Sequence, residues 1–275
     1  MPHVIPYQGS KRLLAPAILA VLRERLAGQP VRRLYEPFAG SAAMTLAAAH
    51  AQRADQHVVA DSYGPIVLLW RQIVEAPQLV AEGYRRVWQA GDYDAVRQAF
   101  RRDPTPEDLL YLLTRCVKAA VRFNRRGEFN QAADKRRRGT HPDRMAALIA
   151  AAAELLRGRT EFRIGDALET TCDATAGDVA YLDPPWHGTT VGNDNRYHAG
   201  YTRAQLLTLI DALHSRGVLV LLSYDGKRAG QDFAQMLPDS LRRLDLPAMR
   251  SAQATLLGRA EWTTESLYVT DTLRQ

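Results

Sequence analysis

The sequence contains no apolar run close to the roughly 20 residues that a membrane-spanning helix requires. One apolar stretch, residues 13–22, follows Lys11 and Arg12 and so resembles the start of a signal peptide. It lacks a small-residue cleavage site and runs directly into Arg23, which favours an ordinary helix. The sequence therefore excludes a membrane protein and predicts a cytoplasmic one.

Cysteine is also scarce, because the chain has only Cys116 and Cys172. Two such widely separated residues cannot form a disulfide framework or a thiolate metal site. His187 and His198 lie on either side of a polar loop, without the close spacing of paired metal ligands. We therefore expect reduced cysteines and no metal ion.

Positive charge is present in excess, and it is unevenly distributed. The chain has 36 Lys and Arg residues against 30 Asp and Glu, a formal net charge of +6. Residues 77–157 hold 16 of the basic and 10 of the acidic residues, so the whole excess lies in this internal segment. Between 115 and 138, nine basic residues face only Glu128 and Asp134. A solvated helix face is the simpler interpretation, but such an imbalance favours a polyanionic partner.

The order of expected elements predicts an α/β fold. Strands are expected at 33–36, 57–60, 161–164, 179–182, 218–223, 241–246 and 266–270, and helices at 11–26, 65–74 and 203–215, the first capped by Ser10. Residues 77–157 show only helical periodicity, near 79–90, 92–101, 106–121 and 142–157. Because strands alternate with helices, we predict a parallel, doubly wound sheet from residues 1–76 and 158–275, with a mostly helical insertion at 77–157.

Turns at the carboxyl ends of parallel strands are the usual ligand sites of such sheets. The first turn, Glu36 to Ala43, consists of small residues but contains a single glycine, Gly40, and so lacks the G-x-G-x-x-G phosphate loop. Asp61 ends the second strand, where a carboxylate can bind both hydroxyls of a ribose. A nucleoside without a pyrophosphate fits this pattern, and so does a tight turn that binds no ligand.

A more specific motif follows the strand at 179–182, namely Asp183-Pro184-Pro185-Trp186. An exocyclic amino group on a nucleobase is a weak nucleophile, because its lone pair is delocalised into the ring. The Asp183 carboxylate and the Pro184 carbonyl can each accept a hydrogen bond from that group, and Trp186 offers a flat face to an extruded base. A helix cap is the structural alternative for Asp183. The motif favours methyl transfer to an amino nitrogen.

Taken together, these motifs resemble those of the Dam-like (D12 class) DNA amino-methyltransferases of the α group, which use S-adenosylmethionine. The resemblance rests on Tyr7-Gln8-Gly9-Ser10-Lys11, on the turn at 36–43 with Asp61, on Arg122-Phe123-Asn124-Arg125-Arg126-Gly127-Glu128-Phe129-Asn130, and on the tetrapeptide at 183–186. It implies a Rossmann-like S-adenosylmethionine-dependent methyltransferase sheet whose insertion is the target-recognition domain. Two positions depart from the pattern: Trp186 replaces the usual tyrosine, and Ala42 stands where a second glycine is common.

The resemblance also implies roles for individual residues. Catalysis is assigned to Asp183, Pro184, Pro185 and Trp186. Cofactor binding is assigned to Tyr7, Lys11, Glu36, Phe38, Ala39, Gly40, Ser41, Asp61, Asp166 and Asp183. Contact with double-stranded DNA is assigned by the resemblance to Arg122, Asn124, Arg125, Arg126 and Asn130, and the local excess of positive charge adds Lys135, Arg136, Arg137 and Arg138.

The expected reaction is methyl transfer to adenine N6 in duplex DNA after base flipping. Cytosine N4 is the nearest alternative, and RNA or protein amides are other acceptors. A nicotinamide oxidoreductase is disfavoured by the missing glycines, and a non-catalytic DNA-binding module by the intact tetrapeptide. The sequence leaves open the recognition site, a cognate restriction endonuclease in a restriction-modification system, and the choice between a monomer and a weak dimer.

Overall fold

The computed structural model describes most of the chain. The described residues are 1–7, 9–119, 121–124, 126–185, 201–224, 227–228, 231–232, 237, 241–246, 249–250, 262–263 and 266–270. Arg125 and Trp186, both expected to be functional, lie outside these ranges.

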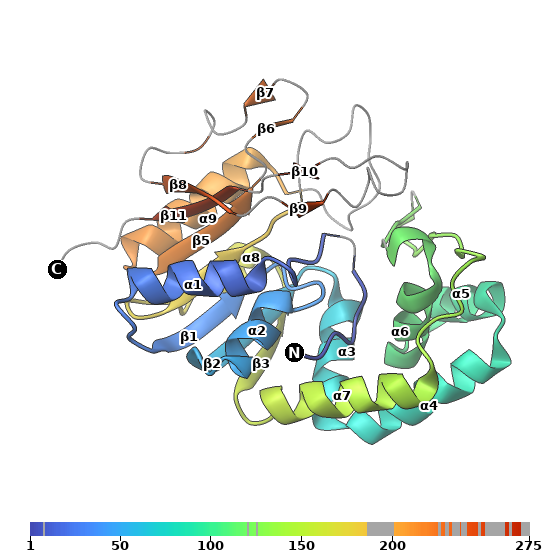
Figure 1. The fold of residues 1–275 in the computed structure, drawn as a ribbon. Coiled ribbons are helices and arrows are strands. Elements are labelled where there is room, and N and C mark those ends of the chain that lie inside the picture. Colours follow the sequence, from blue (N-terminus) through green and yellow to red (C-terminus); the bar gives the residue numbers. More distant parts are fainter. Residues whose placement is uncertain are drawn as a thin grey trace.

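A seven-stranded sheet forms the centre of the molecule (Figure 1). In spatial order its strands are β3 (Thr160–Ile164), β2 (Ala54–Asp61), β1 (Val31–Glu36), β4 (Val179–Leu182), β5 (Leu219–Tyr224), β11 (Ser266–Thr270) and β8 (Leu241–Asp245). The strands from β3 to β5 are parallel, whereas β11 runs antiparallel to both of its neighbours. The predicted α/β, Rossmann-like fold class is confirmed.

The prediction of an entirely parallel sheet is wrong at β11. All of its residues are buried. A strand buried on both faces shows the same apolar run in either direction, so its own residues do not encode its orientation.

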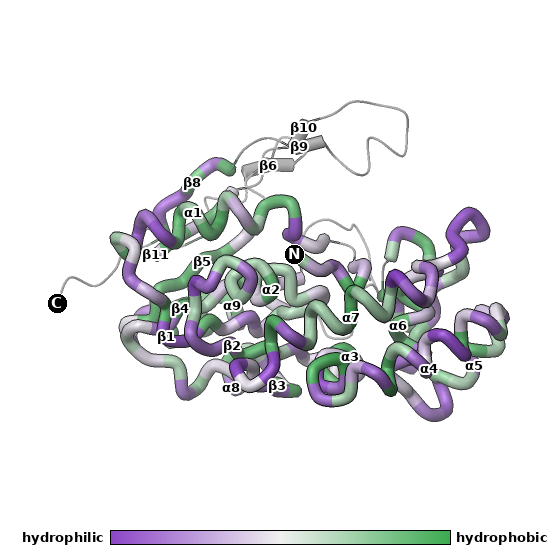
Figure 2. The backbone as a smooth tube through the Cα atoms, turned by 60° about the horizontal axis from the view of Figure 1, so that its bottom comes forward, coloured by the Kyte–Doolittle hydropathy of each residue, from purple (hydrophilic) through white to green (hydrophobic). Residues whose placement is uncertain are grey.

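Strand β4 shows how the sheet is covered on both faces. Val179 and Tyr181 belong to a hydrophobic cluster with residues of α1 (Ala15–Arg25) and α2 (Ala43–His50). Ala180 and Leu182 belong to another cluster, with residues of α9 (Arg203–Ser215). Because successive side chains of a strand point to opposite faces, two-sided burial requires the continuous apolar run that the sequence shows. Figure 2 shows the same hydrophobic character along β5.

Four helices are inserted between α3 (Gly64–Glu75) and β3, and they lie beside the sheet (Figure 1): α4 (Pro77–Ala90), α5 (Tyr93–Arg102), α6 (Pro106–Arg115) and α7 (Pro142–Leu156). Tyr84 of α4 and Ile149 of α7 share one hydrophobic cluster with Leu46 of α2 and Trp70 of α3. The insertion is therefore packed firmly against the two helices that flank β2. That it forms a domain of its own stays a prediction.

The start of the first helix differs from the prediction. Helix α1 begins at Ala15, and its N-cap residue, Leu14, makes no side-chain capping bond. Ser10 was expected to cap this helix, but its Oγ instead accepts a hydrogen bond from Ser41 Oγ at 2.8 Å. Residues 12–14 form turns before the helix begins.

The end of α6 also differs, because the helix stops at Arg115 and not near residue 121. Cys116 pairs with Ala133, and the N–H of Val117 donates to the carbonyl of Ala132 at 3.0 Å. This pairing with a distant segment overrides the helical periodicity of the sequence.

Other local predictions are confirmed. Strands β4 and β11 have the expected bounds, and α9 begins after Thr202, whose side chain forms a capping box with Gln205. Among the described residues, we find no helix with both the length and the apolar character needed to cross a membrane.

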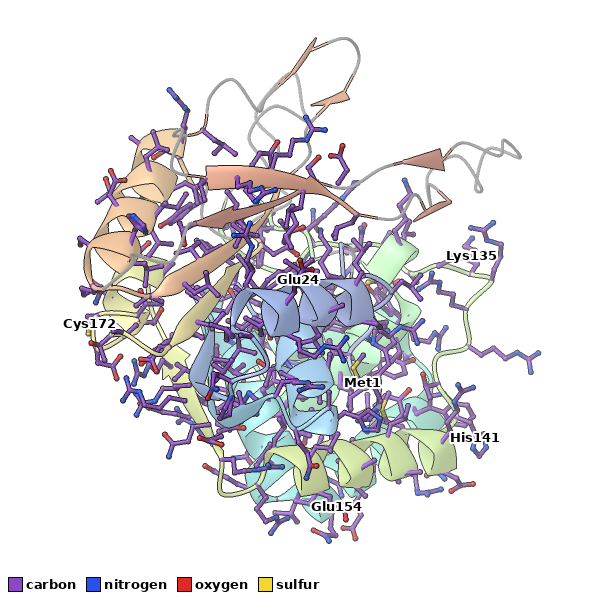
Figure 3. The ribbon with its side chains drawn as sticks, turned by 60° about the vertical axis from the view of Figure 1, so that its left-hand side comes forward. Met1, Glu24, Lys135, His141, Glu154 and Cys172 are labelled. Atoms are coloured by element: carbon purple, nitrogen blue, oxygen red, sulfur yellow. The ribbon has the colours of Figure 1, made fainter. Side chains whose placement is uncertain are left out.

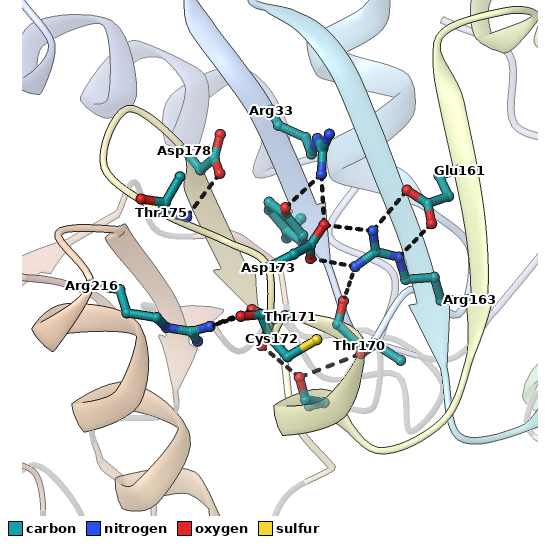
Figure 4. Close-up of polar contacts among 12 residues, drawn as sticks. Arg33, Glu161, Arg163, Thr170, Thr171, Cys172, Asp173, Thr175, Asp178 and Arg216 are labelled. Atoms are coloured by element: carbon teal, nitrogen blue, oxygen red, sulfur yellow. Dashed lines mark hydrogen bonds and ion pairs between the residues drawn. The ribbon is translucent and has the colours of Figure 1, made fainter.

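A network of ion pairs ties β1 and β3 to the segment before β4 (Figure 4). Asp173 contacts Arg33 of β1 at 2.8 Å and Arg163 of β3 at 2.6 Å, and Arg163 also pairs with Glu161 at 2.8 Å. Hydrogen bonds from Arg163 hold the pKa of Asp173 well below its usual range. Because these charges satisfy one another, the network braces the sheet.

His57 on β2 is 1% exposed, and neither of its ring nitrogens has a hydrogen-bond partner among the described residues. Burial lowers the pKa of His57 to about 4. The folded protein therefore binds a proton here less readily than the unfolded chain does.

We expect His57 to make folding sensitive to acid. Its contribution is constant above pH ~6.5 and is lost progressively as the pH falls toward 4, because only the unfolded chain gains the proton. Between pH 7 and pH 5 the free energy of unfolding should fall by about 2 kcal/mol more in the wild type than in His57→Leu. Urea unfolding at both pH values measures this difference, with the exposed His50→Leu as the control. Equal pH dependence in wild type and His57→Leu would contradict it.

Candidate active site

A cavity lies where the strand order of the sheet reverses, at the carboxyl ends of β1, β2 and β4. The chain leaves β1 towards β2 on one side, while β4 lies on the other side, and open α/β sheets bind ligands at such a switch point. The cavity brings together residues that the sequence assigned to cofactor binding and catalysis: Tyr7, Lys11, Glu36, Phe38, Ala39, Gly40, Ser41, Asp61, Asp166, Asp183, Pro184 and Pro185. The individual roles of these residues stay predictions.

The loop after β1 is held in place from both ends. The Glu36 carboxylate accepts hydrogen bonds from the N–H groups of Met44 and Thr45, at 3.2 and 2.8 Å, at the start of α2. Gly40 has a positive φ of 45°, and a Cβ atom there would come within 3.1 Å of the Tyr7 ring. Glycine at this position lets the N-terminal segment pack directly on the loop.

Asp61 connects this loop to the start of α3. Its Oδ2 accepts the N–H of Gly40 at 3.1 Å, and its Oδ1 accepts the N–H of Tyr63 at 2.9 Å. A carboxylate has about four lone-pair positions, so each oxygen can accept more than one hydrogen bond. Asp61 can therefore bind hydroxyl groups while it holds the walls of the cavity together.

Asp183 follows β4 and faces a lysine from the N-terminal segment. Lys11 Nζ lies 3.1 Å from Asp183 Oδ1, and the two side chains are 8% and 20% exposed. Lys11 Nζ also donates to the carbonyl of Gly9 at 3.4 Å. The sequence assigned Lys11 to cofactor binding, and the structure additionally places its charge against the first residue of the tetrapeptide.

Glu36 is the second acid of this group. Burial raises the pKa of Glu36 to about 7, and the nearby negative charge of Asp183 adds to the increase. The hydrogen bonds from Thr45 and Met44 act in the opposite direction but do not cancel the effect of burial. A cation that enters the cavity would favour the ionised form of Glu36.

One residue that lines the cavity, Tyr201, was not singled out by the sequence. The Tyr201 ring, just before α9, meets Phe38 edge to face with centroids 4.9 Å apart. Burial and the charge of Asp166 raise the pKa of Tyr201. Asp166 itself caps α8 (Ala167–Thr170) by accepting the N–H of Leu168 at 2.9 Å.

Other lining residues were also missed, among them Tyr63, Phe123, Tyr181 and Gln205. Tyr63 is two residues after the acid of β2, and Tyr181 is two residues before the acid of β4. For both tyrosines, the short distance in sequence to an acid at a strand end was a signal that could have identified them. Phe123 belongs to the insertion, and no local pattern places it at the sheet.

The arginine-rich element of the insertion forms a tight turn. Asn124 Oδ1 accepts the N–H groups of Arg126 and Glu128, at 2.9 and 3.0 Å, and Asn124 Nδ2 donates to Glu128 Oε2 at 2.7 Å. Asn124 was expected to contact DNA, but in this structure its side chain shapes the turn. Arg122 is exposed on the same segment, and Asn130, also exposed, accepts a hydrogen bond from an arginine of α5.

The basic run at 135–138 lies at the outer edge of the insertion, and Figure 3 shows Lys135 pointing away from the sheet. Arg136 and Arg137 pair with Asp134 at 3.2 and 3.6 Å. Lys135 and Arg138 are exposed and form no ion pair within the described part of the chain. The backbone of the run is fixed, because the Trp88 indole donates to the carbonyl of Arg138 at 3.0 Å.

Some expected residues cannot be placed. Trp186, the last residue of the tetrapeptide, and Arg125, in the arginine-rich element, lie outside the described residues. The same holds for His187 and His198.

Known proteins similar to this chain include two DNA adenine methyltransferases. The DNA N-6-adenine-methyltransferase of Escherichia phage P1 is 28% identical over 207 residues, which cover 71% of this chain. This chain spans only 27% of the length of that phage protein. The retron Ec67 DNA adenine methylase of Escherichia coli is 26% identical over 240 residues, covering 81% of this chain and 77% of that protein.

Among solved structures, a presumed RNA methyltransferase from Pyrococcus horikoshii matches with a TM-score of 0.43 and 11% identity, over 95% of this chain and 84% of that one. A likeness at this level says nothing about substrate. A sequence model of one family, however, matches residues 7–252. This match includes both the cavity and the insertion, and the chain therefore belongs to the D12 class of N6 adenine-specific DNA methyltransferases.

Proposed function

We propose that this protein transfers a methyl group from S-adenosylmethionine to the N6 amino group of adenine in double-stranded DNA. The observation that carries the proposal is the position of Asp183-Pro184-Pro185 at the edge of the same cavity that Asp61 lines. A ribose-binding acid and acceptors for an amino group thus face one space at the switch point of the sheet. Family membership supports the choice of DNA and of adenine.

The residues of the cavity fit S-adenosylmethionine. Asp61 offers carboxylate oxygens to the ribose hydroxyls, and Gly40 leaves room for close approach to the loop after β1. The Asp61 and Asp183 carboxylates outnumber the one ammonium group of Lys11 in the lining of the cavity, which suits a cationic ligand. When bound, the cofactor supplies an electrophilic methyl group on a sulfonium centre.

The protein's own part in the reaction is to prepare the acceptor. The Asp183 carboxylate and the Pro184 carbonyl accept hydrogen bonds from the two amino hydrogens, which directs the nitrogen lone pair towards the methyl group. The bound cofactor would supply the methyl carbon, and the amino group would release one proton to the solvent in exchange. Lys11 holds the Asp183 carboxylate in place before the base enters.

DNA docks on the insertion in this proposal. The insertion carries the excess positive charge of the chain, and its exposed arginines and lysine meet the phosphates. The arginine-rich turn at 122–130 lies next to the cavity through Phe123, so a flipped base can reach Asp183 while this turn contacts the duplex.

Expression in a host that lacks DNA methylation tests the function directly. Nucleoside analysis of the host DNA should show N6-methyladenine. N4-methylcytosine in its place would shift the assignment to the cytosine alternative, and unmodified DNA with a folded, expressed protein would reject the proposal.

Replacing Asp183 should separate catalysis from binding. We expect Asp183→Ala to lower the single-turnover methylation rate at least ~100-fold, because one acceptor of the amino group is lost. Binding of duplex DNA should be retained, as fluorescence anisotropy can show. The exposed Asp211→Ala on α9 is the control. A rate close to that of the wild type would remove Asp183 from the catalytic site.

Replacing Asp61 should weaken cofactor binding. We expect Asp61→Ala to raise the dissociation constant of S-adenosylmethionine roughly 30-fold, about 2 kcal/mol, the scale of lost hydrogen bonds to a charged group. Titration calorimetry measures the affinity, and thermal unfolding checks that the variant is folded. Asp55→Ala, on an exposed position of the same strand, should bind normally. Unchanged affinity in the Asp61 variant would exclude its role at the ribose.

The ion pairs of the basic run predict unequal effects within it. Replacing both Lys135 and Arg138 by alanine should reduce the magnitude of the slope of log affinity against log salt by about 1.8, because two unpaired cations are lost. Replacing Arg136 and Arg137 should lower it less, since Asp134 already engages them. Anisotropy titrations across a salt series measure these changes. Each change should be the same on two duplexes of different sequence. An unchanged slope after removing all four would show that DNA binds elsewhere.

A further inference from the structure

Phe123 is the place where the basic insertion meets the cavity. It is 7% exposed and lines the cavity together with residues of the β1 and β2 loops. Its ring contacts the Tyr63 ring edge to face, with centroids 5.1 Å apart. One aromatic side chain of the insertion therefore forms part of the wall against which a cofactor would pack.

Tyr63 connects that wall to the Asp61 carboxylate. The Tyr63 N–H donates to Asp61 Oδ1 at 2.9 Å, and Asp61 Oδ2 accepts the N–H of Gly40 at 3.1 Å. Tyr63 is 7% exposed and belongs to the hydrophobic cluster that also contains Val59 of β2 and Phe123. A continuous set of contacts thus runs from the loop after β1 to the insertion.

Phe123 is also part of the arginine-rich turn at 122–130. It pairs with Phe129 in an antiparallel bridge, and its neighbour Arg122 is exposed. Phe129 is anchored to α5, through a ring contact with Phe100 at 6.0 Å and a hydrogen bond from Arg101 to its carbonyl at 2.9 Å. The Phe129 side of the turn is therefore fixed to α5, and the Phe123 side is fixed to the cavity wall.

We infer that Phe123 is a positioning residue that couples the cofactor to DNA recognition: a filled cavity holds the Phe123 ring, and the ring holds Arg122 and the turn in the DNA-binding arrangement. This inference rests on the proposed function, since it takes the cavity to be the cofactor site and the turn to be the DNA-facing element.

The coupling follows from packing. Phe123 lines the cavity, so a nucleoside bound there would pack against the ring and restrict its motion. Ordering the ring in advance reduces the entropy that DNA binding must otherwise cost. By linkage, DNA must then strengthen cofactor binding by the same factor.

The test is a binding cycle with two ligands. One is S-adenosylhomocysteine, which cannot transfer a methyl group, and the other is an unmethylated duplex that contains a sequence that the wild-type protein methylates. Calorimetry gives the affinity for S-adenosylhomocysteine with and without saturating duplex, and anisotropy gives the affinity for duplex with and without S-adenosylhomocysteine. For the wild type we expect each ligand to raise the affinity for the other about tenfold, and we call this ratio of affinities the coupling factor.

Four variants isolate the ring. Phe123→Leu keeps an apolar side chain but loses the aromatic contact, and Tyr63→Leu removes the same contact from the other side. Phe123→Tyr retains the ring. Phe129→Leu is the matched control, because it lies across the bridge from Phe123 and packs against α5. Thermal unfolding of each variant verifies that it is folded.

The coupling factor should fall to about one in Phe123→Leu and Tyr63→Leu, while Phe123→Tyr and Phe129→Leu keep the wild-type factor, even if Phe129→Leu weakens duplex binding. Wild-type coupling in Phe123→Leu would overturn the inference, as would two ligands that bind the wild type independently. If the wild type binds no S-adenosylhomocysteine at all, the proposed function fails together with the inference. Loss of coupling alone leaves the proposed function intact.

Discussion

The candidate active site depends on the hydrogen bonds that the Asp61 carboxylate accepts. With its two oxygens it accepts N–H groups from Gly40 and Tyr63, and so it joins the loop after β1 to the start of α3. Each hydrogen bond uses only part of the acceptor capacity of its oxygen. The same side chain can thus build the cavity and bind a ligand in it. An amide or a hydroxyl could not do both, because only the carboxylate brings acceptors without a competing donor.

The sequence predicts this part of the molecule well for a physical reason. Strands β1, β2 and β4 each end in a stretch of buried apolar residues, and the acid that follows this stretch marks the edge of the sheet. Glu36, Asp61 and Asp183 all occupy such positions. Parallel strands bring these ends together whatever the details of packing, which is why the acids of the cavity could be found without a structure.

The remainder depends on contacts between distant segments, which local patterns do not encode. Tyr201 reaches the cavity from the segment before α9, and Phe123 from the insertion, and no local pattern places either residue at the sheet. The end of α6 is set by pairing with residues near 132, and there Lys118 and Ala119 take up left-handed conformations with φ of 59° and 50°. Such strained backbone persists only where surrounding contacts impose it, so periodicity alone extends the helix too far.

Ala42 shows how such strain and packing balance within the loop that follows β1. It adopts a left-handed conformation with φ of 49°, which glycine would reach more easily by about 1 kcal/mol. Its methyl group, however, is fully buried in the cluster shared with the insertion, and burying one such group contributes about 0.8 kcal/mol. The two effects nearly cancel, so alanine is acceptable at 42. At Gly40 φ is also positive, at 45°, but a Cβ there would crowd the Tyr7 ring at 3.1 Å, so the strain of a left-handed residue would be joined by a shift of that ring.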